Sequence, residues 1–524
     1  MTEQRKSWLS LAALFLLLLI LAVWRPLAVP DEGRYGEIGR WMLQSGDWLT
    51  PRLNGIPFFH KPPYLYWLEA ISLAVFGAHA WALRLVPALH AGLMLLALYL
   101  SARQFTPEAV ARRAAWMLGS SLSFLMGGQY VNHDMLVASW IGVAIWCFAL
   151  AFMHGDRPQA ALARWGFVAC ALGVLSKGMI GLALPGLVLL IWLGWTRQLK
   201  KVLYLPWLSG LTLFALIAVP WFWLAGQQFP GMLDYMFGAQ QVSRFSATTF
   251  NNRQPWWFYL PCLLILLFPW ALLALAQARA QLRRPALALV SGSGSGKAAQ
   301  DGAPRPWTAL CWIWLLAILG FFSIPSSKII GYALPVMPPL ALLAALGWDC
   351  VVARFKLALP AQRRWFAGLC TACMALALGA NIAAARYTGK RSTQEVAQAL
   401  QAAGAKPSDP LYLLESDYAY DLPFYRQASV PMVVIQDWPA LRKSVGDNWK
   451  SELLEGAAFD PQAARVLQTR EALAQARAQP NAWLLSGQAQ PPEDFILVFK
   501  GSAWSLYRPQ SAQPSAPKSP KAAE

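Results

Sequence analysis

The chain has 524 residues, of which 57% are hydrophobic and only 13% are charged, and its mean hydropathy is +0.38. This composition lies outside the range of soluble globular proteins and indicates a protein that resides in a membrane. The formal net charge of +18 would suit a nucleic-acid-binding protein. However, the basic residues fall in alternate connections between apolar segments. The excess of positive charge is therefore explained by the membrane topology, and no nucleic-acid partner is expected.

Apolar runs long enough to cross a membrane recur along most of the chain. A bilayer core about 30 Å thick needs roughly 20 mostly apolar residues per helix, and we predict about eleven spans. They lie near residues 8–24, 81–100, 114–130, 135–153, 165–176, 178–195, 203–224, 256–277, 307–323, 329–348 and 365–387. Because the run at 165–176 is short, counts of ten to thirteen spans also fit the sequence. The first run follows Arg5 and Lys6, as in a signal peptide, but Trp24 stands where a small cleavage-site residue is needed, so we interpret it as a membrane anchor.

The charged residues predict which connections lie on which side of the membrane. Every second connection is basic, and by the positive-inside rule these connections are cytoplasmic. They contain Arg103, Arg112, Arg113, Arg157, Arg164, Arg197, Lys200, Lys201, Arg279, Arg283, Arg284, Arg354, Lys356, Arg363 and Arg364. The other connections, at residues 25–80, 131–134, 225–255 and 324–328 and the break at Lys177, are therefore predicted to face the periplasm of a bacterial inner membrane.

Composition divides the chain into parts. Residues 1–387 are predicted to form a transmembrane domain, in which residues 25–80 are the first periplasmic loop. Residues 388–509 have strand-like runs at 411–414, 431–435 and 495–499 and a helix-like stretch at 461–478, which predict a small periplasmic α/β domain. Residues 510–524 are predicted to be a disordered tail, and the glycine- and serine-rich residues 291–306 a flexible cytoplasmic linker.

The first outer loop carries the densest set of polar residues. Apolar positions recur at helical spacing across residues 32–43, which predicts an amphipathic helix lying in the membrane interface. Asp31 follows Pro30 at the start of this helix and could simply be its N-cap. A second acid beside it, Glu32, is unnecessary for capping, which favours a functional role for the pair.

Ionisable residues also lie at the outer ends of later spans. Asp134, with Asn132 and His133, opens one span, and Lys177 interrupts an apolar hairpin; Arg244 and Lys328 lie in outer loops. Charges at membrane depth are costly and by default mark function or pair with each other. Since the predicted topology places all of them on one side, we predict a shared outer site.

Acids and cations beside an apolar bundle suit one class of substrate particularly well. A lipid-linked phosphosugar offers an anionic phosphate for Lys and Arg to hold, while its isoprenoid tail stays in the bilayer. A carboxylate can then act as a general base or stabilise positive charge that develops on the sugar.

Several motifs at these residues resemble a known family. In chain order they are Asp31-Glu32-Gly33-Arg34-Tyr35, Gly46-Asp47-Trp48, Thr50-Pro51-Arg52-Leu53-Asn54-Gly55, Lys61-Pro62-Pro63 with Tyr66-Trp67, Ser176-Lys177-Gly178, Arg244-Phe245, Trp257-Phe258-Tyr259-Leu260-Pro261, and Ser327-Lys328 leading to Tyr332 and Leu334-Pro335. Together they look like the bacterial aminoarabinose transferases, which are grouped with the protein mannosyltransferases among the membrane glycosyltransferases that use polyprenyl phosphate sugars. The resemblance covers roughly residues 8–390 and implies a GT-C type fold.

The resemblance also implies roles for individual residues. Carried over by position, Asp31 corresponds to the family's essential loop aspartate and Lys61 to its phosphate-holding lysine, with Arg244 as a second phosphate ligand and Lys328 as a further contact. The predicted site therefore has catalytic Asp31, Glu32 and Asp134; donor-phosphate ligands Lys61, Arg244, Lys328 and Lys177; and loop-shaping Arg34, Tyr35 and Arg52. If the acceptor is a lipid A phosphate, the nucleophile is already ionised, and Asp31 could instead orient the sugar through its amino group.

One departure from the family concerns a metal. The aminoarabinose transferases carry Glu just before the lysine, where this chain has His60, and a His in a later outer loop, where it has Gln240 and Gln241. His60 and His133 could form a different metal site, or they could be simple hydrogen-bonding residues. No other cofactor is expected.

The sequence thus predicts an inverting glycosyltransferase with a polyprenyl (undecaprenyl) phosphate sugar as donor and an envelope glycolipid as acceptor. The most specific form is transfer of 4-amino-4-deoxy-L-arabinose to lipid A phosphate. Transfer of another lipid-linked sugar to core, O-antigen or protein is an alternative, because acceptor choice depends on loops. A membrane transporter is a further alternative, although transporters usually place ionisable residues near the bilayer midplane within internal repeats, which this sequence lacks.

Overall fold

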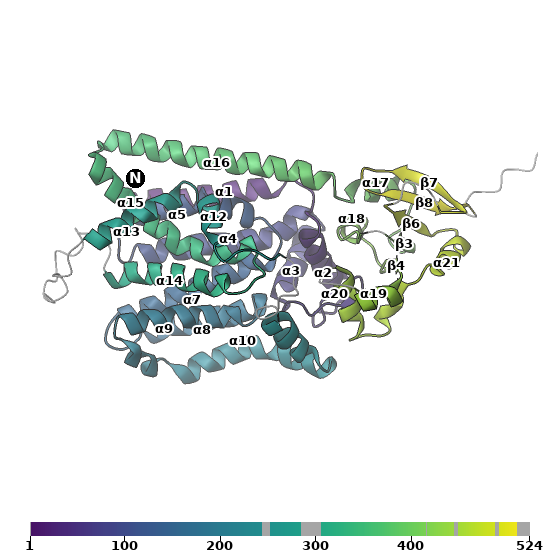
Figure 1. Ribbon diagram of the computed structural model, residues 1–524, viewed down its shortest axis with the longest axis horizontal. Coiled ribbons are helices and arrows are strands. Elements are labelled where there is room, and N and C mark those ends of the chain that lie inside the picture. The colour runs from purple at the N-terminus through teal and green to yellow at the C-terminus, as the bar shows by residue number, and fades with distance from the viewer. Residues whose placement is uncertain are drawn as a thin grey trace, which may run out of the picture. The chain divides into compact units, whose positions relative to one another are not determined.

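The computed structural model describes residues 2–243, 252–283, 305–415, 417–444, 449–487 and 492–510. The chain forms two compact units (Figure 1). The helical unit comprises Met1–Trp24 and Phe59–Ala384, and the α/β unit comprises Arg25–Phe58 and Ala385–Glu524. Arg244, residues 291–304 of the predicted linker and residues 511–524 of the predicted tail lie outside the described residues.

The helical unit is built almost entirely from apolar helices. Its α-helices are α1 (Glu3–Ala22), α3 (Tyr64–Phe76), α4 (Ala80–Ala102), α5 (Glu108–Gly119), α6 (Leu122–Gly127), α7 (His133–Met153), α8 (Ala160–Lys177), α9 (Ile180–Trp195), α10 (Trp207–Gln228), α12 (Tyr259–Leu266), α13 (Trp270–Arg283), α14 (Arg305–Ser323), α15 (Met337–Phe355) and α16 (Leu359–Gly389), whose last turn enters the α/β unit. The 3₁₀ segments η1 (Leu199–Tyr204) and η4 (Ile330–Val336) and the π-helix η2 (Asp234–Ser243) join them.

Among the described residues, eight helices are long and apolar enough to cross a membrane, or nine if the bent pair α12–α13 is one span. The eight correspond one by one to the predicted spans at 8–24, 81–100, 135–153, 165–176, 203–224, 307–323, 329–348 and 365–387. On α10, large side chains such as Leu208 and Trp223 are exposed, as expected for a helix that faces lipid. The chain is therefore a multi-pass membrane protein.

The remaining three predicted spans differ from regular membrane-crossing helices, so the count of eleven is not confirmed. The run at 114–130 is broken into α5 and α6, because the Ser121 hydroxyl accepts the backbone N–H of Phe124 and starts a new helix. The run at 178–195 is α9, with only 16 residues. The run at 256–277 is α12 and α13, bent by 110° where Pro269 interrupts the backbone hydrogen bonding.

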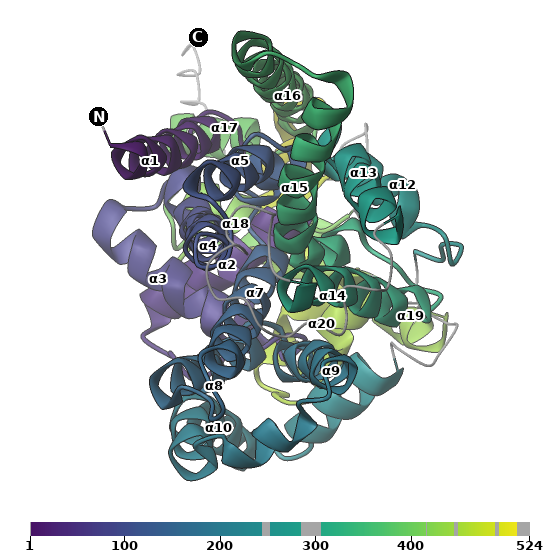
Figure 2. The same cartoon turned by 90° about the vertical axis from the view of Figure 1, so that its left-hand side faces the viewer.

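The hairpin of α8 and α9 turns at a position that requires glycine. Gly178 ends α8 with φ +93°, a conformation that glycine adopts without steric cost. Above the turn, a Cβ atom on Gly173 would lie 3.0 Å from Gly181 Cα, so the two backbones are in direct contact. Such small-residue contacts allow close helix packing in membranes. The view in Figure 2 shows α8 between α7 and α10, both of which contact it.

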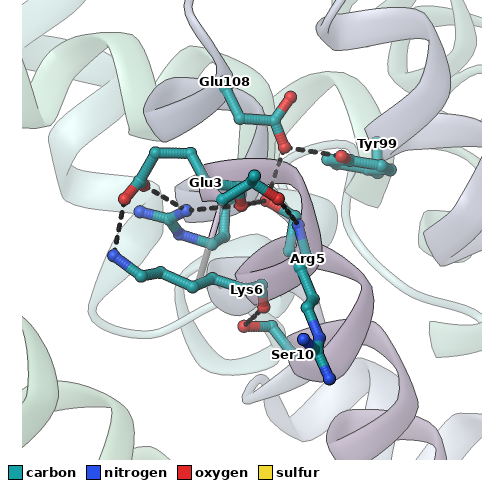
Figure 3. A network of polar contacts seen from close by, with 9 residues as sticks. Glu3, Arg5, Lys6, Ser10, Tyr99 and Glu108 are labelled. Atoms are coloured by element: carbon teal, nitrogen blue, oxygen red, sulfur yellow. Dashed lines mark hydrogen bonds and ion pairs between the residues drawn. The ribbon is translucent and has the colours of Figure 1, made fainter.

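A polar network ties α1 to α4 and α5 (Figure 3). The Glu108 carboxylate, at the first position of α5, accepts hydrogen bonds of 2.5 Å from the Ser7 and Tyr99 hydroxyls. Glu3 forms ion pairs with Lys6 at 2.6 Å and with Arg112 at 2.8 Å. The Glu108 bonds are partly buried and fix the register of α1, whereas the exposed Glu3 pairs contribute little.

The α/β unit combines the first loop with the C-terminal segment. From the first loop come α2 (Asp31–Ser45) and the short antiparallel strands β1 (Arg52–Leu53) and β2 (Ile56–Pro57). The C-terminal segment supplies α17 (Gln394–Ala402), β3 (Leu411–Leu414), α18 (Leu422–Arg426), β4 (Val433–Ile435), α19 (Trp438–Ser444), α20 (Trp449–Ala457), η5 (Ala463–Val466), β5 (Leu467–Gln468), α21 (Ala472–Ala478), β6 (Trp483–Ser486), β7 (Phe495–Lys500) and β8 (Ser505–Pro509).

Six of these strands form one mixed sheet in the order β5-β4-β3-β6-β8-β7. The four strands β5, β4, β3 and β6 are parallel, and β8 and β7 add an antiparallel hairpin. The predicted strands at 411–414, 431–435 and 495–499 are confirmed as β3, β4 and β7. The predicted helix at 461–478 is interrupted, because Leu467 and Gln468 pair with β4. The 3₁₀ helix η5 precedes this strand and α21 follows it.

Within the α/β unit, the first loop packs with the C-terminal segment. Asn54 exchanges two hydrogen bonds with the backbone of Met432, at 2.9 and 2.7 Å. At Gly33 a Cβ atom would lie only 2.9 Å from the Asp421 backbone nitrogen, so the absence of a side chain lets α2 approach this turn. The structure therefore groups residues 25–58 with the segment after residue 384, and not with a transmembrane domain of residues 1–387.

Candidate functional site

Asp134 is held at the start of α7 by a local cap. Asn132 is the N-cap residue, and its side-chain oxygen accepts the Asp134 backbone N–H at 2.9 Å. The Asn132 amide nitrogen in turn donates to Asp134 Oδ2 at 3.2 Å. An acid in the first turn also interacts favourably with the positive end of the helix dipole. The carboxylate of Asp134 is thereby fixed at the end of a membrane-spanning helix.

Lys177 is the partner of Asp134. It is the last residue of α8, and its ammonium donates to Asp134 Oδ1; both side chains are only 11% exposed. The same ammonium lies 4.6 Å from the ring centre of Tyr332, in a cation–π contact. A Cβ atom on Gly331 would collide with the Asp134 carboxylate, so glycine is required there. We call Asp134, Lys177, Gly331 and Tyr332 the Asp134 cluster.

Lys328 lies four residues before Tyr332 and is buried. Its ammonium donates to the backbone carbonyls of Pro325 and, at 3.1 Å, of Gln254. Its backbone N–H donates to the carbonyl of Asn252 at 3.1 Å. Burial lowers the pKa of the Lys328 ammonium. Lys328 thus joins the segment before α12 to the segment before η4, and a phosphate would have to share its donors with these carbonyls.

Lys61 and His60 lie just before α3. The Lys61 ammonium donates to the His60 carbonyl at 3.1 Å. The His60 imidazole nitrogen Nε2 lies 2.9 Å from the hydroxyl of Tyr235 on η2, and the two rings meet edge to face. His60 therefore connects the end of the first outer loop to the later outer loop, a contact that the sequence does not reveal.

His133 is buried beside the Asp134 cluster. Its ring packs edge to face on Tyr66 of α3, with ring centres 5.3 Å apart. Tyr66, on the helix that follows Lys61, therefore contacts the residue that precedes Asp134.

Across the ranges that the structure describes, no group of three or more His, Cys, Asp or Glu side chains could hold a metal ion. The predicted pairing of His60 with His133 as metal ligands therefore has no third ligand among these residues.

Asp31 belongs to the α/β unit and is the first residue of α2. The N-cap position is occupied by Pro30, so the prediction that Asp31 could be the N-cap is not borne out. Its Oδ1 accepts a hydrogen bond of 2.6 Å from Arg34, and its side chain is 32% exposed. Asp31 is therefore a carboxylate that is oriented by an arginine and still accessible to water.

Arg34 is the centre of the contacts around Asp31. Its second terminal nitrogen donates to Glu452 of α20 at 2.5 Å, and its guanidinium lies 4.7 Å from the ring centre of Tyr35. The ring centre of Tyr420 lies 5.8 Å from the Arg34 guanidinium carbon. Burial raises the pKa of the Tyr420 hydroxyl. Arg34 is thus held by one charge-assisted hydrogen bond to each of two acids and by aromatic rings, and it fixes the Asp31 carboxylate in turn.

Glu32 has a different environment from its neighbour. It is fully buried, and its two oxygens accept hydrogen bonds of 2.5 and 2.8 Å from Arg25. One of them also accepts the Ala28 backbone N–H at 2.7 Å. This bidentate pair closes the turn that leads into α2. The geometry thus supports a structural role for Glu32, which holds the segment that carries Asp31.

Arg52 organises the other end of the first loop. It donates to Asp460 at 2.8 Å and to the Gly55 carbonyl at 2.8 Å, and it lies 3.7 Å from the Asp47 carboxylate. Although partial burial opposes the shift, the hydrogen bond from Arg52 lowers the pKa of Asp460. Arg52 therefore joins two parts of the first loop to Asp460, which comes from the distant C-terminal segment.

The structure sorts the predicted site residues into two sets. In the helical unit it joins Asp134 to Lys177, with Lys328 on the same segment as Tyr332; in the α/β unit it joins Asp31 to Arg34 and Tyr35. We predicted no role for Tyr332, Tyr235 or Glu452, which are partners of these residues. Tyr332 could have been found from its place in the motif that follows Lys328, but no local pattern marks Tyr235 or Glu452.

Known proteins are similar to this chain in fold and in sequence. The family described as dolichyl-phosphate-mannose-protein mannosyltransferase matches residues 6–236. Crystal structures of ArnT from Cupriavidus metallidurans, one bound to undecaprenyl phosphate and one in the apo state, superpose with a TM-score of 0.76 each at 23% identity. The superposition on the first structure covers 95% of this chain and 97% of the ArnT chain. The fold of this chain is therefore the fold of these ArnT structures.

Curated proteins of similar sequence are named as arabinosyl transferases. An undecaprenyl phosphate-alpha-4-amino-4-deoxy-L-arabinose arabinosyl transferase from Pseudomonas savastanoi pv. phaseolicola is 34% identical over 347 residues, which are 66% of this chain and 61% of that protein. One from Aeromonas salmonicida is 33% identical over 342 residues, 64% of this chain and 59% of its own length. The chain thus spans about three fifths of these curated relatives. The predicted resemblance to the aminoarabinose transferases is confirmed.

Proposed function

We propose that this protein is an inverting glycosyltransferase that moves a sugar from undecaprenyl phosphate to an envelope lipid. Its most specific form is transfer of 4-amino-4-deoxy-L-arabinose to a phosphate of lipid A. The observation that carries the proposal is the Asp134 cluster, a charged pair at the ends of two spans, in a chain related to arabinosyl transferases. A lysine held at the membrane surface by a carboxylate suits a lipid-linked phosphate.

In this reaction an oxygen of the acceptor phosphate attacks the anomeric carbon of the sugar. The bond from this carbon to the donor's phosphate oxygen breaks, and its electron pair leaves with undecaprenyl phosphate. The configuration at carbon inverts because attack and departure take place on opposite faces. A phosphate acceptor is ionised at neutral pH, so no base has to remove a proton. The protein's main task is to stabilise charge on the leaving phosphate and on the sugar.

Lys61, Arg244, Lys177 and Lys328 are proposed as ligands of the donor phosphate. Charge-assisted hydrogen bonds from several cations would neutralise the charge that the phosphate gains as it leaves. The structure supports Lys177 in particular, because Asp134 and the Tyr332 ring fix its ammonium at the end of α8. Asp134 would then act by positioning Lys177 as well as through its own charge.

Asp31 is proposed as the essential carboxylate. Its contact with Arg34 fixes its direction, and its partial exposure leaves an oxygen surface for a substrate. A carboxylate there would pair with the sugar's amino group or stabilise the positive charge of an oxocarbenium-like transition state. Glu32, Arg34, Tyr35 and Arg52 would shape the loop around it.

The alternation of basic connections supports a location in the bacterial inner membrane, with these residues on the periplasmic side. Reporter fusions test it: a fusion at residue 279, on α13, should report cytoplasm and a fusion at residue 420 should report periplasm. A cytoplasmic signal at 420 would place Asp31 on the wrong side for an envelope acceptor.

The reaction itself is tested with purified protein in vesicles. Undecaprenyl phosphate aminoarabinose and lipid A would be supplied, and the products followed by mass spectrometry. Aminoarabinose on lipid A, together with free undecaprenyl phosphate, is the expected result. Product only with another lipid-linked sugar or another acceptor would redirect the specificity within the same class. Transport of the donor without any transfer would overturn the enzyme assignment.

A further inference from the structure

The β7–β8 hairpin at the edge of the α/β sheet has an unusual apolar surface. Leu497 and Val498 are 45% and 41% exposed although they are neighbours in β7. Successive strand residues normally point to opposite faces, but a register shift between Leu497 and Phe499 interrupts the pairing with β8. The irregularity lets both side chains face outward, next to the partly exposed Ile496 and Phe499.

The turn of this hairpin is attached to the end of a membrane-spanning helix. The Ser502 hydroxyl donates a hydrogen bond of 3.0 Å to the carbonyl of Lys390. Lys390 is the first residue after α16, a candidate span that ends at Gly389. The hairpin turn is therefore hydrogen-bonded to the first residue after this candidate span. The bond lies within the α/β unit, to which both residues belong.

The side chains around this point are those of a membrane interface. Lys390, Arg391 and Lys500 are exposed, and Tyr387, on the last turn of α16, is 63% exposed. Arg391 donates to the Tyr387 hydroxyl at 2.5 Å and also lies over its ring. Tyrosine and basic residues at the end of a span are typical of the headgroup layer, where cations meet lipid phosphates.

The two ends of the hairpin differ in charge. Lys500 lies at the turn, which is hydrogen-bonded to Lys390. The other end carries both signs, because Asp494 precedes β7 and lies 3.4 Å from Arg477, and Arg508 of β8 pairs with Ile496. A strand of six residues spans roughly 20 Å, so the acid is far from the basic turn. The end of the hairpin that adjoins α16 is therefore the one that complements an anionic surface.

We propose that the β7–β8 hairpin docks on the membrane leaflet at which α16 ends. Leu497 and Val498 would enter the boundary between headgroups and acyl chains, while Lys390, Arg391 and Lys500 bind anionic phospholipid headgroups. A second copy of the chain is the other occupant that an exposed edge strand can take. The irregularity at Leu497 argues against it, because a bulged edge offers a broken ladder of hydrogen bonds.

The test places a fluorescent amino acid at Val498 in the full-length protein by nonsense suppression. The protein is reconstituted in nanodiscs of phosphatidylethanolamine and phosphatidylglycerol, or of phosphatidylcholine alone. Quenching by brominated lipids is compared with quenching by aqueous iodide. The matched control carries the same probe at Gln475, an exposed position on α21 in the same unit. We expect several-fold stronger lipid quenching at 498 than at 475, and the reverse order for iodide.

The lipid composition and a charge variant test the headgroup contact. In phosphatidylcholine the lipid quenching at 498 should fall. In the anionic nanodiscs, the double variant Lys390→Gln with Lys500→Gln should lower the ratio of membrane-docked to undocked hairpin by roughly fivefold for each removed cation. Iodide quenching at 498 equal to that at 475 would overturn the proposal. So would equal lipid quenching in both compositions, or energy transfer between probes at 498 on two copies.

Discussion

Replacing Lys177 by methionine tests whether the Asp134 cluster is held together as the structure indicates. The Asp134 and Lys177 side chains are each only 11% exposed, so removing the ammonium leaves a carboxylate with little access to water. Breaking a buried pair in this way costs about 3 to 5 kcal/mol, and the residual exposure favours the lower end. The lost cation–π contact with Tyr332 adds about 1 kcal/mol. Lys177→Met should therefore lower the free energy of unfolding by about 3 to 4 kcal/mol.

The double variant Asp134→Asn with Lys177→Met removes both charges. It should recover about 2 to 3 kcal/mol relative to Lys177→Met, because no uncompensated charge remains. The assay is unfolding in a denaturing detergent, followed by circular dichroism, with donor binding measured on the same preparations. Arg113→Met is the matched control, since its pair with Asp349 is 20% and 50% exposed and should contribute at most about 1 kcal/mol.

The two properties together separate a structural role from a functional one. If Lys177 binds the donor phosphate, the double variant regains stability but not donor affinity. Lys177→Met with the stability of the wild type would refute the buried pair. Full donor affinity in the double variant would refute the proposed phosphate contact while leaving the pair intact.

Three further predictions concern other residues of the candidate site. Asp31→Asn should abolish sugar transfer but leave donor binding and folding unchanged, since an amide keeps the shape and not the charge; near wild-type turnover would remove Asp31 from catalysis. Lys61→Ala and Arg244→Ala should each weaken donor binding by about 1.5 to 3 kcal/mol, with partial rescue by Lys61→Arg, and unchanged affinity in both alanine variants would contradict their assignment. The hydrogen bond from Arg52 lowers the pKa of Asp460 below its ordinary value of 3.8, so the pair stabilises the fold above pH 3.8 and loses this effect as the pH falls through the lowered pKa. The melting temperature of Asp460→Asn should therefore fall less steeply with decreasing pH than that of the wild type. Parallel slopes for the two proteins would contradict this prediction.

The sequence by itself determined the class of protein and most of its regular elements. Apolar runs of membrane-spanning length predicted each of the eight candidate spans, because a span is defined by a window of about 20 consecutive residues. The motif of the first loop predicted the resemblance to the aminoarabinose transferases, and β3, β4 and β7 followed from local β propensity. All of these properties are readable within short stretches of chain.

Only the tertiary structure decided which polar residues meet. Arg34 bonds to Glu452 across 418 positions, and Lys177 bonds to Asp134 across 43. The tertiary structure also explains why part of the predicted helix at 461–478 is strand β5, since pairing with β4 outweighed local helix propensity. A charged residue within an apolar run is expected to have a partner, because an unpaired buried charge is costly, but many residues could be that partner. The partner is chosen by how distant helices and strands pack, and no local pattern of residues records that packing.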